Sequence, residues 1–167
     1  DDLRNILERS SARETTMRVA VGAIAKKILN EFGVEISSHV TRIASVESQI
    51  SALNNDSGLS SGKEYKPEVW KKLVQMAEES EMACADEKAT KEMMDLVNEA
   101  QKTGDSLGGQ FEVIATGVPV GLGSHVHWDR RLDGVVAMAM MSINAMKAVE
   151  FGIGNKVAEI PGSQVHD

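Results

Sequence analysis

The chain has 167 residues, 42% of them hydrophobic and 26% charged, which is typical of a globular domain with a buried core. Its 18 basic and 25 acidic residues give a formal net charge of −7, which disfavours binding to nucleic acid or to an anionic membrane. The single cysteine, Cys84, excludes an internal disulfide, and the apolar run over residues 135–141 is too short to cross a bilayer. We therefore expect a soluble, cytoplasmic protein.

The two ends of the chain lack the usual features of a complete protein. It opens on Asp1 without an initiator methionine and stops at Asp167 without a terminal helix pattern. We expect residues 1–167 to form a single domain that is cut from a longer chain.

A helix is predicted over residues 12–32. Ser11 and Glu14 have the spacing of a capping box, and Gly33 stands where a left-handed cap would end the helix. Apolar residues recur between them with a helical period, at Met17, Val21, Ile24 and Ile28.

Two segments alternate between apolar and polar residues, as strands do. One strand is predicted over residues 34–46, with Val34, Ile36, Ser38 and Val40 on one face and Glu35 and His39 on the other. A second strand is predicted over residues 110–116, with one face formed by Phe111, Val113 and Ala115.

The segments between these strands predict a loop and two helices. Residues 48–66 are rich in Ser, Asn, Asp and Gly and indicate an exposed loop insertion without chemistry. Helices are predicted from Pro67 to about Glu79, and from a cap at Asp86 to Thr103 and Gly104, both as surface cover.

A fourth helix is predicted over residues 132–149, followed by a strand over residues 149–153. The helical segment is rich in Ala, Met, Val and Ile on all sides, which indicates a buried helix. The mixture of strands and helices without a regular βαβ order favours an α+β fold.

The start of the first predicted helix is a candidate anion site. Arg9 and Arg13 flank Ser10 and Ser11, where free helix amides and the positive end of the helix dipole attract a phosphate or carboxylate. The alternative is that Ser11 only caps the helix and both arginines are solvated surface residues.

His125, His127 and Asp129 alternate, so on a strand they would share one face and could bind zinc. No further Cys or His follows nearby to complete the ligand set, and the alternatives are polar loop residues or subunit contacts. His39 and His166 are interpreted as ordinary polar positions.

Asn144 and Lys147 fall inside the predicted buried helix, where polar side chains need partners. Asn144 could bond to the backbone or to the ring N–H and C=O groups of a heteroaromatic ligand, and Glu150 could pair with Lys147. Gly152 and Gly154 do not form a dinucleotide fingerprint.

Four blocks of this chain together resemble the chorismate synthase family. They are residues 9–26, which read RSSARETTMRVAVGAIAK, residues 117–133 with GVPVGLG and DRRLD, residues 141–152 with MSINAMKAVE, and residues 162–167. The resemblance implies the central portion of a four-layer β-α-α-β sandwich from a bacterial, monofunctional-type enzyme that forms homotetramers.

The resemblance also implies an activity, the anti 1,4-elimination of phosphate from 5-enolpyruvylshikimate-3-phosphate to give chorismate. Reduced FMN is required without net redox change, and NADPH serves only indirectly as reductant. By this resemblance Arg9, Ser10, Ser11, Asn144 and Ala145 contact the flavin, and Ser11 and Arg13 contact the substrate.

The chain also departs from the family. The two catalytic histidines of the family lie in an N-terminal portion, and none of His39, His125, His127 and His166 matches them. The family's Gly-Asp-Gly-Phe after Glu150 is replaced here by residues 152–155, which read GIGN. We therefore expect no catalytic residue and no activity in this chain alone. The competing hypotheses are a metal-dependent hydrolase using His125, His127 and Asp129, and a non-catalytic assembly domain.

Overall fold

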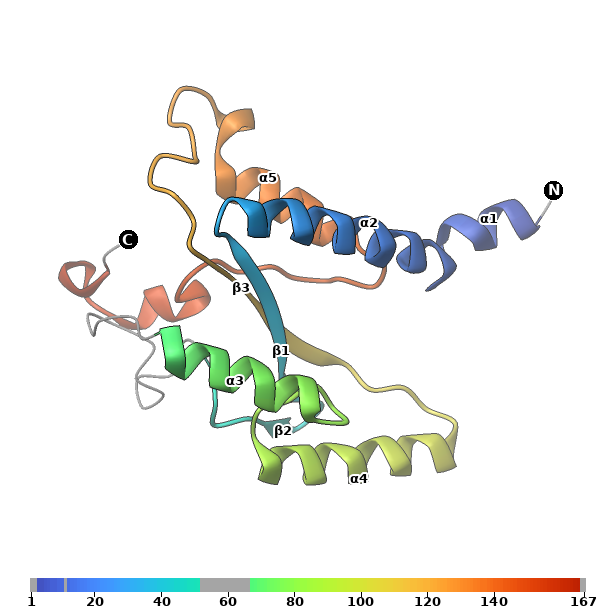
Figure 1. Ribbon diagram of the computed structural model, residues 1–167. Coiled ribbons are helices and arrows are strands. Elements are labelled where there is room, and N and C mark those ends of the chain that lie inside the picture. Colours follow the sequence, from blue (N-terminus) through green and yellow to red (C-terminus); the bar gives the residue numbers. More distant parts are fainter. Residues whose placement is uncertain (1–2, 11, 52–66, 166–167) are drawn as a thin grey trace. The chain divides into compact units, whose positions relative to one another are not determined.

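The computed structural model describes residues 3–10, 12–51 and 67–165 and has the predicted α+β composition (Figure 1). The helices are α1 (Leu3–Ser10), α2 (Ala12–Glu31), α3 (Pro67–Glu79), α4 (Glu87–Thr103) and α5 (Leu132–Met141). The strands are β1 (Glu35–Ile43), β2 (Val46–Glu47) and β3 (Gly109–Thr116), and short 3-10 turns are η2 (Trp128–Arg130), η3 (Gly154–Glu159) and η4 (Gly162–Gln164). The chain divides into two compact units. Residues 1–35 and 116–167 form one unit, and residues 36–115 form the other.

Helix α2 matches the predicted helix to within one residue. It ends before Gly33, whose φ of 75° is the predicted left-handed cap. Sequence reasoning missed α1, although Leu3, Ile6 and Leu7 have helical spacing. Ser11 lies outside the described residues, so the capping box stays a prediction.

The predicted strand over residues 34–46 is a hairpin instead. Strands β1 and β2 pair antiparallel with Arg42 opposite Glu47 and Ile43 opposite Val46. Ala44 lies in the turn with a φ of 48°. The turn was missed because it lacks the Asn or Gly that usually supplies positive φ in a two-residue hairpin.

The sheet has the order β2-β1-β3. Strand β3 confirms the second predicted strand, but its Phe111, Val113 and Ala115 face is exposed in this chain, while Glu112 and Ile114 are half-buried. On β1 the predicted polar face is also wrong, because His39 is buried and Ser38 is exposed.

The buried core of residues 36–115 is built on α3 and α4, so the prediction that these helices are only surface cover is wrong. Cys84, Ala89 and Met93 form a cluster, against which Val40, Ile43, Val46 and Met82 pack. Trp70 and Ala77 of α3 are also buried. The predicted caps of α4 are confirmed. Asp86 accepts hydrogen bonds from the amides of Lys88 and Ala89, and Gly104 adopts the left-handed conformation.

The predicted exposed loop begins with buried residues. Ser48 and Ser51 are 1% and 8% exposed, and the Ser48 hydroxyl bonds to the backbone of Ile50. The prediction is wrong at these positions because hydrogen bonds satisfy the polar side chains inside the fold, locally for Ser48 and with Glu112 for Ser51. Residues 52–66 of the predicted loop lie outside the described residues.

Helix α5 is shorter and more exposed than predicted. It ends at Met141, and none of its described residues is buried; Met138 is 70% exposed. The strand predicted over residues 149–153 is replaced by a turn in which Gly152 and Gly154 both have positive φ. Among the described residues, no helix is long and apolar enough to span a membrane.

Candidate functional site

The predicted anion site lies at the junction of α1 and α2. Arg9 and Ser10 end α1, and Arg13 is an exposed residue in the first turn of α2. The Ser10 hydroxyl donates to the carbonyl of Ile6 at 2.8 Å, so its proton is used inside α1 while its oxygen can still accept a hydrogen bond. Ser11 and the side chain of Arg9 lie outside what the structure describes.

The residues predicted inside a buried helix form a turn after α5. Ser142 is the C-cap of α5, Asn144 is half-buried in the turn, and Lys147 is exposed. The burial penalty expected for Lys147 therefore does not arise. Ala145 has a φ of 69°, a left-handed backbone conformation that residues other than glycine rarely adopt. Such conformations persist where the surrounding structure holds them, and they cluster at ligand sites.

Arg18 joins α2 to this turn. Its Nε donates to both carboxylate oxygens of Glu14, at 2.9 and 2.8 Å, and its Nη1 donates to the Ser142 hydroxyl at 2.8 Å. The hydrogen bond to Glu14 is the main reason that the pKa of Arg18 is raised. Figure 1 shows α2 and α5 lying side by side in this unit. The structure thus connects two segments that the sequence singled out separately.

The turn after Ala145 continues to a second hydrogen-bonded loop. Glu150 accepts a hydrogen bond from the Asn155 amide side chain at 2.5 Å and from the Asn155 backbone amide at 3.4 Å. The structure therefore gives Glu150 a partner other than the Lys147 considered in the sequence analysis. Gly154 has a φ of 55°, a conformation that favours glycine, and a Cβ there would also meet the Glu150 side chain.

The possible zinc ligands do not form a metal site. His125 and His127 lie in irregular structure before η2, not on a strand, and the Nδ1 of His127 lies 2.7 Å from Oδ1 of Asp129. Among the described residues, which include all three, no group of His, Cys, Asp or Glu side chains could hold a metal ion. The metal-dependent hydrolase hypothesis is therefore not supported.

An exposed ion pair follows this segment. Nη2 of Arg131 lies 2.5 Å from Oδ2 of Asp133. The hydrogen bond from Arg131, and next the bond from the Gly134 amide, hold the pKa of Asp133 below its usual value.

Sequence reasoning missed a buried polar cluster in residues 36–115. Nε2 of His39 lies 3.0 Å from Oε2 of Glu112, and the Ser51 hydroxyl donates to Oε1 of the same carboxylate. The Trp70 ring packs edge-on against His39 at 5.9 Å, and its Nε1 donates to Ser37. His39 is 4% exposed, and its Nδ1 has no partner among the described residues. No local sequence pattern links His39 to Glu112, which lies on a different strand.

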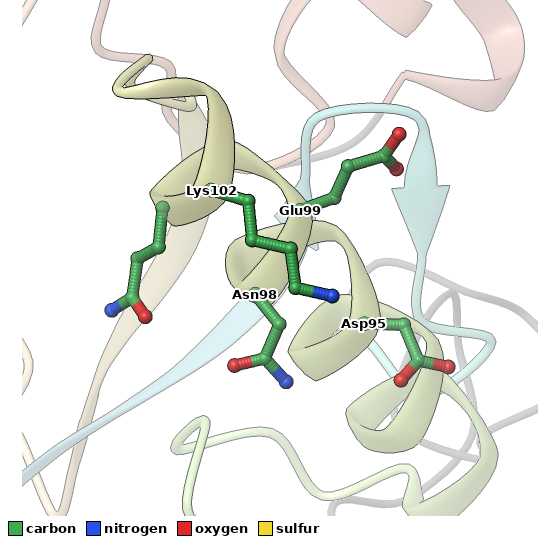
Figure 2. Close-up of a pocket in the computed structure, with 5 residues that line it drawn as sticks. Asp95, Asn98, Glu99 and Lys102 are labelled. Atoms are coloured by element: carbon green, nitrogen blue, oxygen red, sulfur yellow. The ribbon is translucent and has the colours of Figure 1, made fainter.

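A hollow on α4 does not have the character of an enzyme site. Figure 2 shows that Asp95, Asn98, Glu99 and Lys102 all project from this one helix, and Gln101 completes the lining. Ligand pockets are usually concave, largely apolar and built from several elements. These polar side chains are the solvated face of α4.

The fold and these sites together define a class of protein. It is an α+β protein whose candidate groups are a helix start with Arg13 and a turn with Asn144. The family model of chorismate synthase matches residues 1–167, and the chain therefore belongs to the chorismate synthase family.

Similar proteins share this family name. The chain is 51% identical to a chorismate synthase from Geobacillus sp. (strain WCH70) and 49% identical to one from Bacillus subtilis (strain 168), each over 166 residues. In both comparisons 99% of this chain matches 39% of the relative, so the chain spans well under half of their length. A crystal structure of a chorismate synthase matches with a TM-score of 0.86 and 49% identity over 99% of this chain and 48% of that one.

Proposed function

We propose that residues 1–167 form a single domain, the middle part of a chorismate synthase, which converts 5-enolpyruvylshikimate-3-phosphate to chorismate. The observation that carries this proposal is the match of the family model to the whole chain. The 49% identity and TM-score of 0.86 to a crystal structure of a chorismate synthase support it.

The proposed reaction is a lyase reaction, an anti 1,4-elimination in which a ring proton and the phosphate group leave the substrate. In this proposal the catalytic histidines belong to another part of the protein, so these residues contribute binding groups. The reaction requires reduced FMN without net redox change, and NADPH acts only as the source of electrons that keep the flavin reduced.

The donor chemistry of this chain suits both ligands. Arg13 is a permanent cation in the first turn of α2, where the helix dipole adds to its attraction for an anion. We assign it, with Ser11, to the anionic groups of the substrate. The Asn144 amide can both donate and accept hydrogen bonds, which matches the N–H and C=O pattern of a flavin ring.

In this proposal the flavin is held by Arg9, Ser10, Ser11, Asn144 and Ala145. When bound, reduced FMN would supply an electron-rich ring beside the electron-poor transition state. Ser10 retains an acceptor oxygen despite its bond to Ile6. Ala145, in its left-handed conformation, fixes the direction in which the turn after Asn144 presents its backbone.

The proposed enzyme is a cytoplasmic homotetramer. Large apolar side chains exposed in this chain support a larger assembly, because an isolated protein rarely leaves such a surface uncovered. On α2 these include Ile24, which is 63% exposed, and on α5 Met138, which is 70% exposed. We expect the rest of the protein to cover them.

The proposal is tested by binding titrations with the full-length enzyme. We expect Arg13→Ala to weaken binding of the shikimate phosphate and Asn144→Ala to weaken binding of oxidised FMN. A lost hydrogen bond to the charged substrate costs about 1.5 to 3 kcal/mol, or roughly tenfold to a hundredfold in affinity. A lost neutral hydrogen bond to the flavin ring costs about 0.5 to 1.5 kcal/mol, or roughly twofold to tenfold. Calorimetry would give both dissociation constants, and circular dichroism would verify the fold.

Two substitutions outside the proposed site serve as matched controls. Arg42 pairs with Glu47 in the β1–β2 hairpin, and Asn98 lies on the exposed face of α4. Arg42→Ala and Asn98→Ala should bind both ligands as the parent does. If Arg13→Ala and Asn144→Ala also bind as the parent does, these residues are not the binding groups. A parent enzyme that binds neither ligand contradicts the proposed function itself.

A further inference from the structure

One chain of hydrogen bonds connects the helix that carries Arg13 to the turn that carries Asn144. It runs from the Glu14 carboxylate through the Arg18 guanidinium to the Ser142 hydroxyl. The Ser142 hydroxyl in turn donates to the carbonyl of Ala139 at 2.6 Å, in the last turn of α5.

The direction of donation in this series of hydrogen bonds is fixed. A guanidinium only donates, so Ser142 must accept from Arg18 through an oxygen lone pair. The hydroxyl proton is then left for the Ala139 carbonyl, as observed. The planar guanidinium of Arg18 donates from Nε to Glu14 and from Nη1 to Ser142. The single ammonium of a lysine cannot reproduce this geometry.

Both ends of this hydrogen-bonded series, Glu14 and Ser142, lie next to proposed ligand groups in the sequence. Glu14 follows Arg13 directly, and Arg18 lies five residues, or about 7.5 Å of helix axis, beyond Arg13. Ser142 precedes Asn144 by two residues and caps α5 before the turn. A regular helix holds Arg13 and Arg18 in place. The turn after α5 is not helical; its backbone hydrogen bonds include those from the Ile143 amide to the Met140 carbonyl and from the Met146 amide to the Ile143 carbonyl.

We propose that Arg18 is a positioning residue that holds the Asn144–Ala145 turn against α2 and so sets the geometry of the flavin site. This inference rests on the proposed function, because it assumes that the turn binds FMN. It assigns Ser142 to the same role, as the group through which Arg18 acts on the turn.

The role is distinct from general stabilisation. The side chains of Arg18 and Glu14 are 39% and 25% exposed, and partly exposed ion pairs contribute little to folding stability. Loss of the Arg18–Ser142 bond should therefore leave the fold intact and release the turn. Flavin affinity should fall, while substrate affinity, assigned to Arg13 on α2, should stay the same.

The test is a double-mutant cycle in the full-length enzyme, with oxidised FMN and the shikimate phosphate titrated separately. Ser142→Ala and Arg18→Met should each weaken FMN binding by about tenfold, since small displacements of a binding group are costly. The double variant should be no weaker than either single variant, because both changes remove the same bond. Ser142→Thr, which keeps the hydroxyl, should restore FMN affinity.

Arg42→Met is the matched control, since it removes an arginine paired with a glutamate outside the site, and it should bind FMN as the parent does. The inference is overturned if Ser142→Ala binds FMN like the parent, or if it weakens FMN and substrate equally. Asn144→Ala separates this failure from that of the proposed function. If Asn144→Ala loses FMN while Ser142→Ala does not, the proposed function stands and the role of Arg18 is wrong. If the parent binds no FMN, both are wrong.

Discussion

The close approach of Gly117 to Gly33 gives a sharp test of packing in residues 1–35 with 116–167. Gly117 follows β3 with a φ of 71°, and a Cβ at this position would lie 2.0 Å from the Gly33 carbonyl oxygen. Real Cβ atoms do not approach other atoms closer than 3.0 Å, so Gly117→Ala must separate two backbone segments by about 1 Å. Backbone yields less readily than the end of a flexible side chain.

The expected cost has two parts. The left-handed conformation costs an alanine about 1 to 2 kcal/mol, and overpacking adds about 1 to 3 kcal/mol. Gly121 is the matched control, because its φ is 91° and a Cβ there meets nothing within 4 Å. Gly121→Ala should therefore lose only the first part. Gly117→Ala should lose both, about 2 to 5 kcal/mol in total.

Urea unfolding of the full-length protein, followed by circular dichroism, measures this difference directly. The free energy of unfolding should fall by about 1 to 3 kcal/mol more for Gly117→Ala than for Gly121→Ala. Equal losses for the two variants would refute the reasoning, since the contact with Gly33 would then have no energetic consequence.

Three further predictions concern the rest of the chain. Met93→Ala should lower the free energy of unfolding by about 2 to 5 kcal/mol in urea titrations, because Met93 is fully buried and the change leaves a cavity. Glu112→Ala should lower it by about 1 to 3 kcal/mol, because buried His39 loses its partner. The lowered pKa of Asp133 should add stability that is fully present above its usual value of 3.8 and lost as the pH falls through the lowered value. Denaturation between pH 2 and 7 should show that Asp133→Asn lacks this component.

Each of these three predictions has a control in the same chain. Met94→Ala affects a half-buried neighbour on α4 and should cost less than Met93→Ala. Glu92→Ala removes a carboxylate that pairs at 4.0 Å with exposed Lys88 and should change stability little. Asp95→Asn changes an exposed carboxylate on α4. A variant that behaves like its control contradicts the corresponding prediction.

The elements that the sequence predicted well are those specified by local signals. Asp86 and Gly104 mark the ends of α4, and Pro67 marks the start of α3. The hairpin turn at Ala44 was missed because alanine is a poor candidate for positive φ, and only tertiary structure holds it there.

The sequence singled out groups for the candidate site but not the connections between them. Arg13 and Asn144 were identified from a helix start and from a polar residue in an apolar segment. The bond from Arg18 to Ser142 joins residues 124 positions apart, and the His39–Glu112 pair joins residues 73 apart. Periodicity and spacing report on neighbours within a segment, so such pairs need the fold.

The burial of α5 was predicted from a segment that is apolar on all sides, yet Met138 is exposed in this chain. A sequence is adapted to the complete protein, and this chain spans 39% of the length of its relatives. In the enzyme proposed above, contacts of α5 with the rest of the protein would account for this apolar pattern.

The central claim is that these residues belong to a working chorismate synthase, and turnover by the full-length enzyme tests it most directly. The measurement is anaerobic incubation with 5-enolpyruvylshikimate-3-phosphate and reduced FMN, with chorismate, phosphate and flavin oxidation followed together. The account predicts equal amounts of chorismate and phosphate, with no flavin consumed in proportion to product. Absence of chorismate, or oxidation of one flavin for each product molecule, would contradict it.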